Sequence, residues 1–234
     1  MTKSDPAAAL EDLSVRVGRL ERERFKCPND GVEVDEAMRR ARLAVERSRS
    51  FSAVWRWVPP PYYTWPLDER AKYLGARSPH HLCKSLLMEN RKAPGGPGNG
   101  AGDPTNPKFV LVVVQYASTL DVKKLTNAIR SLRKDVKKRL DPSQFDFRVA
   151  SKEDNDAVTG FSHNSVTPFG LLRPEGVRIV LADAIVPLRF FFMGGGHEHL
   201  KLAMAVPDFV DALDPIVADI SVPRTSMTIE DLKD

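Results

Sequence analysis

The residues best suited to chemistry lie in segment 159–171, which reads T-G-F-S-H-N-S-V-T-P-F-G-L. Its glycines and proline make it too irregular for a helix, and it lacks the alternation of a strand. Pro168 has no N–H group and favours extended geometry at Thr167. A loop of this kind presents consecutive backbone N–H groups, which suit an anion or the oxyanion that develops during acyl transfer. An ordinary surface turn has a similar composition, so the loop alone leaves both interpretations open.

Lys84 is the second candidate, because it lies in segment 81–90, H-L-C-K-S-L-L-M-E-N, which is predicted to form a strand. Alternation along this strand places Lys84 on the face opposite Cys83 and Ser85. A lysine that faces the interior of a sheet is costly to bury without a counter-charge. An anionic ligand would supply that counter-charge.

Three consecutive glycines, Gly194, Gly195 and Gly196, separate the apolar segments R-F-F-F-M and H-L-K-L-A-M-A. This pattern indicates a hairpin or a near-hairpin whose strands the glycines join. The glycines then have two candidate roles. They either form a tight turn that needs positive φ, or they allow a substrate to approach the backbone closely.

Other kinds of active site receive no support from the sequence. His80, His81 and Cys83 follow no recognised zinc-binding spacing. Ser162 and His163 are neighbours, but the G-x-S-x-G motif of a nucleophilic serine is absent. The glycine-rich motifs of nucleotide-binding loops are also absent. The sequence therefore predicts neither a metal nor a cofactor.

The composition is that of a globular protein, with 42% hydrophobic and 28% charged residues in a chain of 234. The net charge of +4 permits a nucleic-acid partner without requiring one. No apolar run approaches the roughly 20 residues that span a bilayer, and the first residues, M-T-K-S-D-P, lack the apolar core of a signal peptide. Two cysteines do not indicate a disulfide framework. We therefore expect a reduced, cytoplasmic protein without a membrane partner.

The expected fold class is α/β, and a chain of 234 residues is long enough for one substantial α/β domain with appendages or for two small domains. The helices are predicted over residues 35–48, 66–74, 120–140, 151–158 and 206–213. The strands are predicted over residues 51–58, 81–90, 109–116, 177–183 and 216–222. Segment 109–116 is continuously apolar and should be central. The helix over 120–140 has a buried face that includes Val136 and a dense basic face, which is either solvated or in contact with phosphate.

An N-terminal helix is predicted over residues 5–25, where Leu10, Leu13, Val17 and Leu20 form an a/d seam of about two heptads. This seam either packs on the rest of the chain or docks, through residues 8–24, on a partner or a second copy. The chain is accordingly divided into three parts. These are an extension at residues 1–26, a domain at residues 32–222 and a polar tail at residues 223–234 that is expected to fray.

Four segments, taken in order, resemble the YbaK/ProX family of aminoacyl-tRNA deacylases, which is related to the editing insertion of bacterial prolyl-tRNA synthetases. They are L-C-K-S-L-L-M-E-N, F-V-L-V-V-V-Q-Y, T-G-F-S-H-N-S-V-T-P-F-G-L and G-G-G-H-E-H-L-K-L-A-M-A-V-P-D-F-V. The M-E-N after the lysine and the H-N before S-V-T-P are similar to the eukaryotic stand-alone branch. The resemblance covers about residues 54–221. It implies a compact α/β fold with a mixed sheet and surrounding helices around a pocket, and no cofactor.

The resemblance also implies roles for individual residues. Lys84 matches the essential lysine of the family, and residues 164–168 match its G-x-x-x-P loop, whose N–H groups contact the scissile carbonyl. Asn164 stands where bacterial members have glycine, and asparagine tolerates left-handed geometry better than most residues. Catalysis is therefore expected to involve Lys84, Asn164 and Ser165. Substrate binding is expected from loop and pocket-closing residues, namely Phe161, His163, Val166, Thr167, Pro168, Gly194, Gly195, Gly196 and His197.

The implied activity is that of a trans-editing hydrolase, which cleaves the ester between a wrong amino acid and the 3′ end of a mischarged tRNA. Water can attack without a side-chain nucleophile if N–H donors stabilise the oxyanion, and the resemblance implies that a tRNA ribose hydroxyl helps to position that water. Lys84 would hold the terminal adenosine or its phosphate. A small pocket would exclude the right amino acid, with Phe161, Val166 and Phe169 as candidate walls.

Two further hypotheses concern the partners. The basic face of helix 120–140 could meet the acceptor stem of the tRNA. The alternative to an enzyme is a catalytically degenerate module of a multi-synthetase complex, which binds tRNA or aminoacyl-tRNA synthetases and docks through residues 8–24. The sequence does not reveal which amino acid or tRNA is edited, and alanine, serine and cysteine all remain open.

Overall fold

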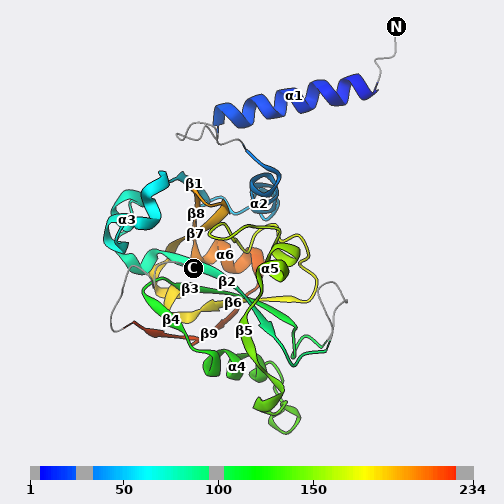
Figure 1. Ribbon diagram of the computed structural model, residues 1–234, viewed down its shortest axis with the longest axis vertical. Helices are drawn as coiled ribbons and strands as arrows, with labels where there is room; N and C mark the ends of the chain where they lie inside the picture. The colour runs from blue at the N-terminus through cyan, green and yellow to red at the C-terminus, as the bar shows by residue number, and fades with distance from the viewer. Residues whose placement is uncertain (1–5, 25–33, 95–102, 225–234) are drawn as a thin grey trace.

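The computed structural model describes residues 6–24, 34–94 and 103–224, and its centre is a five-stranded sheet in the order β5-β2-β3-β6-β9 (Figure 1). The strands are β2 (Cys83–Asn90), β3 (Phe109–Gln115), β5 (Phe147–Val149), β6 (Val177–Ala182) and β9 (Ile216–Ala218). The sheet is mixed, because β3 pairs antiparallel with β2 and parallel with β6. Every residue of β3 is buried, as expected for a continuously apolar central strand. The predicted mixed α/β fold is confirmed.

A second, antiparallel sheet is ordered β1-β8-β7, with β1 (Val54–Trp57), β7 (Phe190–His197) and β8 (Leu200–Ala205). An isolated parallel bridge between Leu82 and Phe192 connects it to the residue that precedes β2. The start of β2 and the middle of β7 therefore lie side by side where the two sheets meet. A short ribbon of β4 (Ser118–Leu120) and β10 (Ser221–Pro223) completes the strands described.

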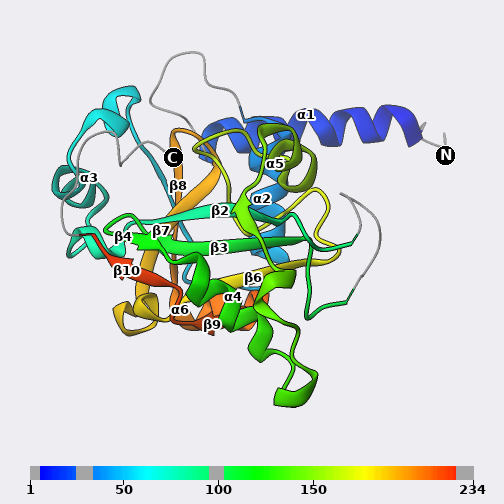
Figure 2. The same ribbon diagram turned by 60° about the horizontal axis from the view of Figure 1, so that its bottom comes forward.

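Residues with capping chemistry mark several of the helix ends. Asp35, Asp121 and Ser151 each accept a backbone N–H at a helix start, and left-handed Gly75 and Gly160 end two helices. In both views α4 and α5 lie on opposite sides of the five-stranded sheet (Figures 1 and 2). The α-helices after the N-terminal one are α2 (Glu36–Arg47), α3 (Leu67–Leu74), α4 (Val122–Ser131), α5 (Lys152–Thr159) and α6 (Val206–Leu213). The 3-10 turns are η1 (Pro60–Thr64), η2 (Pro79–His81), η3 (Val136–Lys138), η4 (Pro142–Gln144) and η5 (Asp183–Leu188).

Three predicted elements need correction. The helix predicted over residues 120–140 is confined to α4, and Val136, predicted to be buried, is 69% exposed. After α4 ends at Ser131, Asp135 starts the separate turn η3, because its side chain accepts the N–H of Lys137. The strand predicted over residues 216–222 consists of β9 and β10, which belong to different sheets. The glycines predicted to join two strands lie inside β7, and the turn follows at Glu198 and His199.

The N-terminal helix α1 (Pro6–Arg24) agrees with the prediction. Its seam residues are exposed, from 46% at Val17 to 72% at Leu10. Among the described residues, no helix has both the length and the apolarity needed to cross a membrane. The prediction that the polar tail frays concerns residues that, beyond Arg224, lie outside the described part of the chain.

Candidate active site

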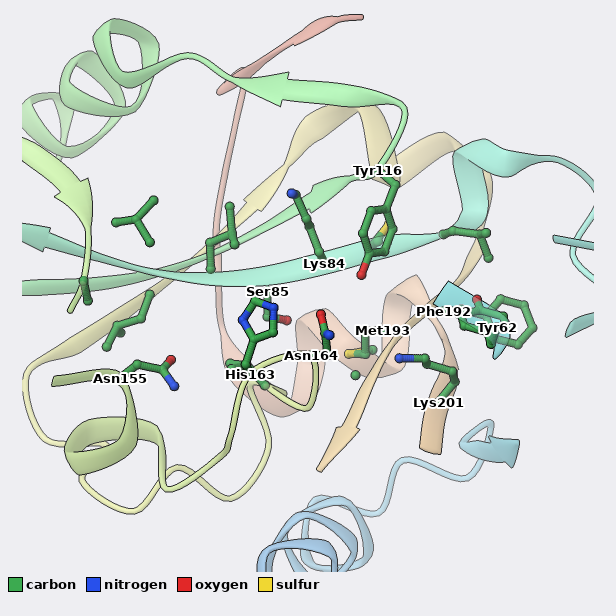
Figure 3. A pocket seen from close by; sticks show the side chains of 18 of the residues that line it. Tyr62, Lys84, Ser85, Tyr116, Asn155, His163, Asn164, Phe192, Met193 and Lys201 are labelled. Carbon is green, nitrogen blue, oxygen red and sulfur yellow. The ribbon is translucent and has the colours of Figure 1, made fainter. Parts of the chain in front are cut away.

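A cavity of about 250 Å³ opens where β2, β7, β8, α5 and the loop after α5 meet (Figure 3). It brings together five of the residues that the sequence analysis selected from three distant segments. Those five are Lys84, His163, Asn164, Val166 and Gly194. In Figure 3, Asn164 and Lys201 lie on one side of β2, and the side chain of Lys84 extends from β2 toward the other side in that view.

The loop after α5 turns at two left-handed residues. Gly160 has a φ of 67° and ends α5, and Asn164 has a φ of 63°. Asparagine is among the few residues that adopt this conformation without a large penalty, so Asn164 takes the left-handed geometry anticipated from the sequence. Ser165 closes the tight turn that contains Asn164, because its N–H donates to the carbonyl of Ser162 at 3.1 Å and its hydroxyl donates to the same oxygen at 2.6 Å.

The carbonyl groups at the tip of this loop accept hydrogen bonds from η1 and β7. The hydroxyl of Tyr63 donates to the carbonyl of Asn164 at 3.0 Å, and the N–H of Gly196 donates to the carbonyl of Ser165 at 3.0 Å. The N–H and C=O of a trans peptide point in opposite directions, so the bond from Gly196 turns the N–H of Val166 away from β7. Within the described part of the chain, the N–H groups of Asn164 and Val166 have no hydrogen-bond partner.

Gly194 permits the loop to lie directly against β7. A Cβ atom at this position would lie 2.2 Å from the carbonyl oxygen of Val166 and 3.2 Å from that of Ser165. No larger residue fits without moving the loop. The glycine therefore serves a close approach, as one of the two sequence hypotheses proposed, but the partner in this structure is the loop itself.

Arg40 of α2 fastens both ends of the loop, and the sequence analysis did not identify it. Its Nε donates to the carbonyl of Gly170 at 2.6 Å, and its Nη2 donates to the carbonyl of Gly160 at 2.8 Å. Its guanidinium also lies 4.8 Å from the centroid of the Phe161 ring. No local signal could have revealed this role, because Arg40 and Gly170 are 130 positions apart.

Three lysines line the cavity, namely Lys84, Lys152 and Lys201, and only Lys84 was expected there from the sequence. Lys84 is half-buried, with its Nζ 5.5 Å from the centroid of the Tyr116 ring. Lys201 on β8 is only 6% exposed, donates to the hydroxyl of Tyr63 and lies 4.5 Å from the centroid of that ring. The available signal for Lys201 was the same as for Lys84, namely a lysine within an apolar strand segment. Tyr63 thus connects Lys201 to the tip of the loop.

Two polar atoms at the cavity are buried without a hydrogen-bond partner in the described structure. They are the Oγ of Ser85, whose residue is 8% exposed, and the Oδ1 of Asn164. A buried polar atom without a partner lowers stability by roughly 1–3 kcal/mol, so a ligand that supplies the missing bonds would recover part of this energy. Cys83 also lines the cavity, but burial raises the pKa of its thiol well above the ordinary value. It therefore stays protonated and is a poor nucleophile.

The other residues selected from the sequence do not line the cavity. Five residues of the loop are buried and do not line the cavity, namely Phe161, Ser165, Thr167, Pro168 and Phe169. Their positions make them supports of the loop. Gly195 and Gly196 are buried within β7, and Gly196 contributes its N–H to the carbonyl of Ser165.

His197 lies at the end of β7, away from the cavity lining. Its ring is 5.7 Å from those of Trp57 and His199. Burial lowers the pKa of His197 below its ordinary value, and the charge of Asp35 opposes this shift. Metal ligation is not indicated here or elsewhere in the described residues, since they contain no group of three His, Cys, Asp or Glu side chains placed to hold an ion.

Comparisons with known proteins agree with this geometry. A profile of the aminoacyl-tRNA editing domain matches residues 60–212. Among solved structures, one described as a proposed trans-editing enzyme for prolyl-tRNA synthetase superposes with a TM-score of 0.61 at 18% identity, covering 81% of this chain and 99% of the other. A hypothetical protein superposes with a TM-score of 0.57 at 18% identity, covering 78% and 99%. The comparison with curated proteins gave no match. The structural neighbours establish the fold, and because the profile spans well over half of the sequence, the chain belongs to the aminoacyl-tRNA editing domain family.

Proposed function

We propose that this protein is a trans-editing hydrolase that cleaves the ester between a wrongly attached amino acid and the 3′ end of a tRNA. The observation that carries the proposal is the pair of unbonded N–H groups of Asn164 and Val166 in a cavity that also holds Lys84. Membership of the editing-domain family supports the choice of an aminoacyl-tRNA as substrate.

The proposed reaction uses water as the nucleophile. Its oxygen forms a bond to the ester carbon, and the carbonyl oxygen becomes an oxyanion that accepts hydrogen bonds from Asn164 and Val166. Collapse of this intermediate breaks the bond to the ribose oxygen, which takes up a proton, and releases the free amino acid. Fixed N–H donors of this kind stabilise the transition state by about 3–4 kcal/mol for each donor. No acyl-enzyme is required, and Ser165 is a poor candidate for one because its hydroxyl is committed to Ser162.

Lys84 is proposed to act as a point charge for the terminal nucleotide, either through its phosphate or through its adenosine. A volume of about 250 Å³ favours a small amino-acid side chain in addition to the ribose ester. Selection would then follow the double-sieve principle, in which the right amino acid is excluded by size. Val166, Leu87 and Met193 line the cavity and are the proposed walls.

The test is a panel of tRNAs, each mischarged with one amino acid, incubated with the wild-type protein and with Lys84→Ala. We expect hydrolysis of a small subset by the wild type and none above background by Lys84→Ala, with an unchanged thermal unfolding curve. Lys123→Ala is the matched control, because Lys123 is exposed on α4, across the sheet from α5. Full activity of Lys84→Ala on the accepted substrate would refute the role proposed for the lysine.

A second candidate function is that of a module which binds synthetases or tRNA without catalysis. The exposed seam of α1, which includes Leu10 and Leu13, is the observation that favours it. The same panel separates the two functions: a folded protein that cleaves none of the mischarged tRNAs but co-purifies with synthetases would support the binding module. Deletion of residues 1–25 would then abolish the association, whereas the editing hydrolase should retain its hydrolytic rate after this deletion.

A further inference from the structure

A second cleft, of about 330 Å³, adjoins the cavity and has no role in the function proposed above. It is formed by the end of α3, η2 and the start of β7. Its chemistry comes from two arginines, one histidine and two phenylalanines, namely Arg77, Arg189, His81, Phe190 and Phe192. No carboxylate lines this cleft, so its charge is positive.

The cleft and the cavity follow one another along the same face of β7. Phe192 lines both of them. Side chains two residues apart in a strand share a face and stand about 6.7 Å apart, so Phe190, Phe192 and Gly194 form a row that leads from the cleft to the loop. The same order holds at α3 and η2: Leu74 and Leu82 line the cavity, whereas the adjacent residues Gly75 and His81 line the cleft.

The two arginines are available to a ligand. Both side chains are exposed, and within the described chain neither guanidinium has a hydrogen bond or an ion pair. The backbone of Arg189 is held in place, because the residue ends η5 with a left-handed φ of 65° and its carbonyl accepts the N–H of Val206 at 2.9 Å. Guanidinium groups bind phosphate oxygens in a bidentate manner, which makes arginine the usual residue for phosphodiester recognition.

Phe190 supplies an aromatic surface beside these charges. Its side chain is only partly buried, and its ring is held edge to face against Phe192, with centroids 5.6 Å apart at an angle of 87°. A partly exposed aromatic ring next to unpaired arginines is the arrangement on which single-stranded nucleic acids bind, because bases stack on the ring while the cations contact the backbone. A duplex would not present its bases in this way.

The basic face of α4 is a weaker candidate for RNA contact. Two of its cations already have partners: Lys124 pairs with Asp219 at 2.8 Å, and Arg130 donates to the carbonyl of Leu140 at 2.7 Å. This helix also lies across the five-stranded sheet from α5 (Figure 2). An RNA bound there would have to pass around the sheet to reach the cavity.

We propose that the cleft at Arg77, Arg189 and Phe190 binds the single-stranded RNA immediately 5′ of the esterified nucleotide, with the arginines on its phosphodiesters and a base on Phe190. This inference rests on the proposed function, since it assigns the path by which the same substrate enters the cavity. The cleft thereby supplies affinity for the RNA, and the cavity supplies the chemistry.

The experiment compares Arg77→Gln/Arg189→Gln with the wild type on two substrates that carry the same amino acid. One is the mischarged tRNA, and the other is the aminoacyl ester of adenosine, which has no 5′ phosphodiester. We expect kcat/KM for the tRNA to fall at least about tenfold, whereas the rate on the adenosine ester is unchanged because this ester does not reach the cleft. The matched control is Lys137→Gln/Lys138→Gln in η3, which removes the same charge from the basic surface and should change neither rate.

Binding of uncharged tRNA, measured as Kd against salt concentration, provides a second readout that does not depend on hydrolysis. Loss of two phosphate contacts to a single strand should reduce the slope of log Kd against log salt by about 1.4. The inference is overturned if the arginine variant keeps the wild-type slope, or if the lysine variant changes it equally. A loss of the same size on both substrates would also overturn it. The proposed function fails separately, if the wild type cleaves neither ester.

Discussion

Substituting Gly194 with alanine tests whether the contact between β7 and the loop positions the N–H donors. The added Cβ would lie 2.2 Å from the carbonyl oxygen of Val166, whereas such contacts are essentially never below 3.0 Å and are ordinary from 3.4 Å. The two atoms must therefore separate by about 0.8–1.2 Å. Gly194 is not among the glycines with positive φ, so its backbone geometry is open to alanine. The perturbation comes from the contact itself, and the backbone neighbour cannot rotate away as a flexible side chain could.

The expected effect is a fall in kcat of about 100-fold. A displacement of about 1 Å in a catalytic group has this consequence, and it equals about 2.7 kcal/mol in the activation barrier. The removal of a single oxyanion donor has a similar effect. KM should stay within about threefold of the wild type, because the loop moves at the ester while the RNA contacts proposed above lie beyond Phe192.

Single-turnover deacylation of the accepted mischarged tRNA measures this change, and thermal unfolding with tRNA binding distinguishes a displaced loop from an unfolded domain. Gly18→Ala is the control, because a Cβ at Gly18 in α1 meets nothing within 4 Å. It should leave kcat unchanged. A folded Gly194→Ala protein with kcat within about threefold of the wild type would refute the positioning argument, since the loop could then be moved without loss of chemistry.

Two further predictions concern neighbouring groups. Tyr63→Phe removes the hydroxyl that accepts from Lys201 and donates to the carbonyl of Asn164, so kcat should fall about tenfold or more at nearly constant KM. Lys201→Met should have a similar effect, and Lys201→Arg should retain more activity. A change confined to KM would contradict a positioning role for Tyr63. Because burial lowers the pKa of His197, the unfolded chain binds the proton more readily, so the free energy of unfolding should decrease as the pH falls through the ordinary value of about 6.5. Urea denaturation between about pH 5 and 8 should show a flatter dependence for His197→Gln, and equal slopes would contradict this assignment.

The parts of the fold that the sequence predicted well are those with strong local patterns. Continuous apolar character indicated the central position of β3, and the helix starts predicted at residues 35 and 151 coincide with the capping residues Asp35 and Ser151. The left-handed turn at Asn164 could also be anticipated, because few residue types tolerate it. In each case the energy that decides the conformation comes from the residue and its near neighbours.

The errors arose where the sequence pattern does not reveal the contact that decides the conformation. The helical pattern of residues 120–140 continued past Ser131, but Asp135 started a new turn, and Arg133 donates through Nη1 to the carbonyl of Lys138 at 2.8 Å. The three glycines suggested a hairpin turn, although Gly194 is a strand residue whose neighbour is the carbonyl of Val166. Composition cannot separate these cases, because a glycine needed for close approach and a glycine needed for a turn are identical in the sequence.

Arg40 and Tyr63, two of the site residues that the sequence did not reveal, share one property, which follows from the chemistry that the loop is proposed to perform. A loop that offers N–H groups to a ligand must leave them unbonded, so its stability has to come from bonds to its carbonyl groups. Such bonds require donors on the opposite side, and the structure supplies them from Arg40, Tyr63 and Gly196. Tyr63 lies 101 positions from the loop residue that it binds. In a chain of this family, the next residues to seek after the loop are therefore long side chains on α2 and η1 that donate hydrogen bonds to the carbonyl groups of the loop. Their loss should leave the cavity in place but should no longer fix the positions of the N–H groups of the loop.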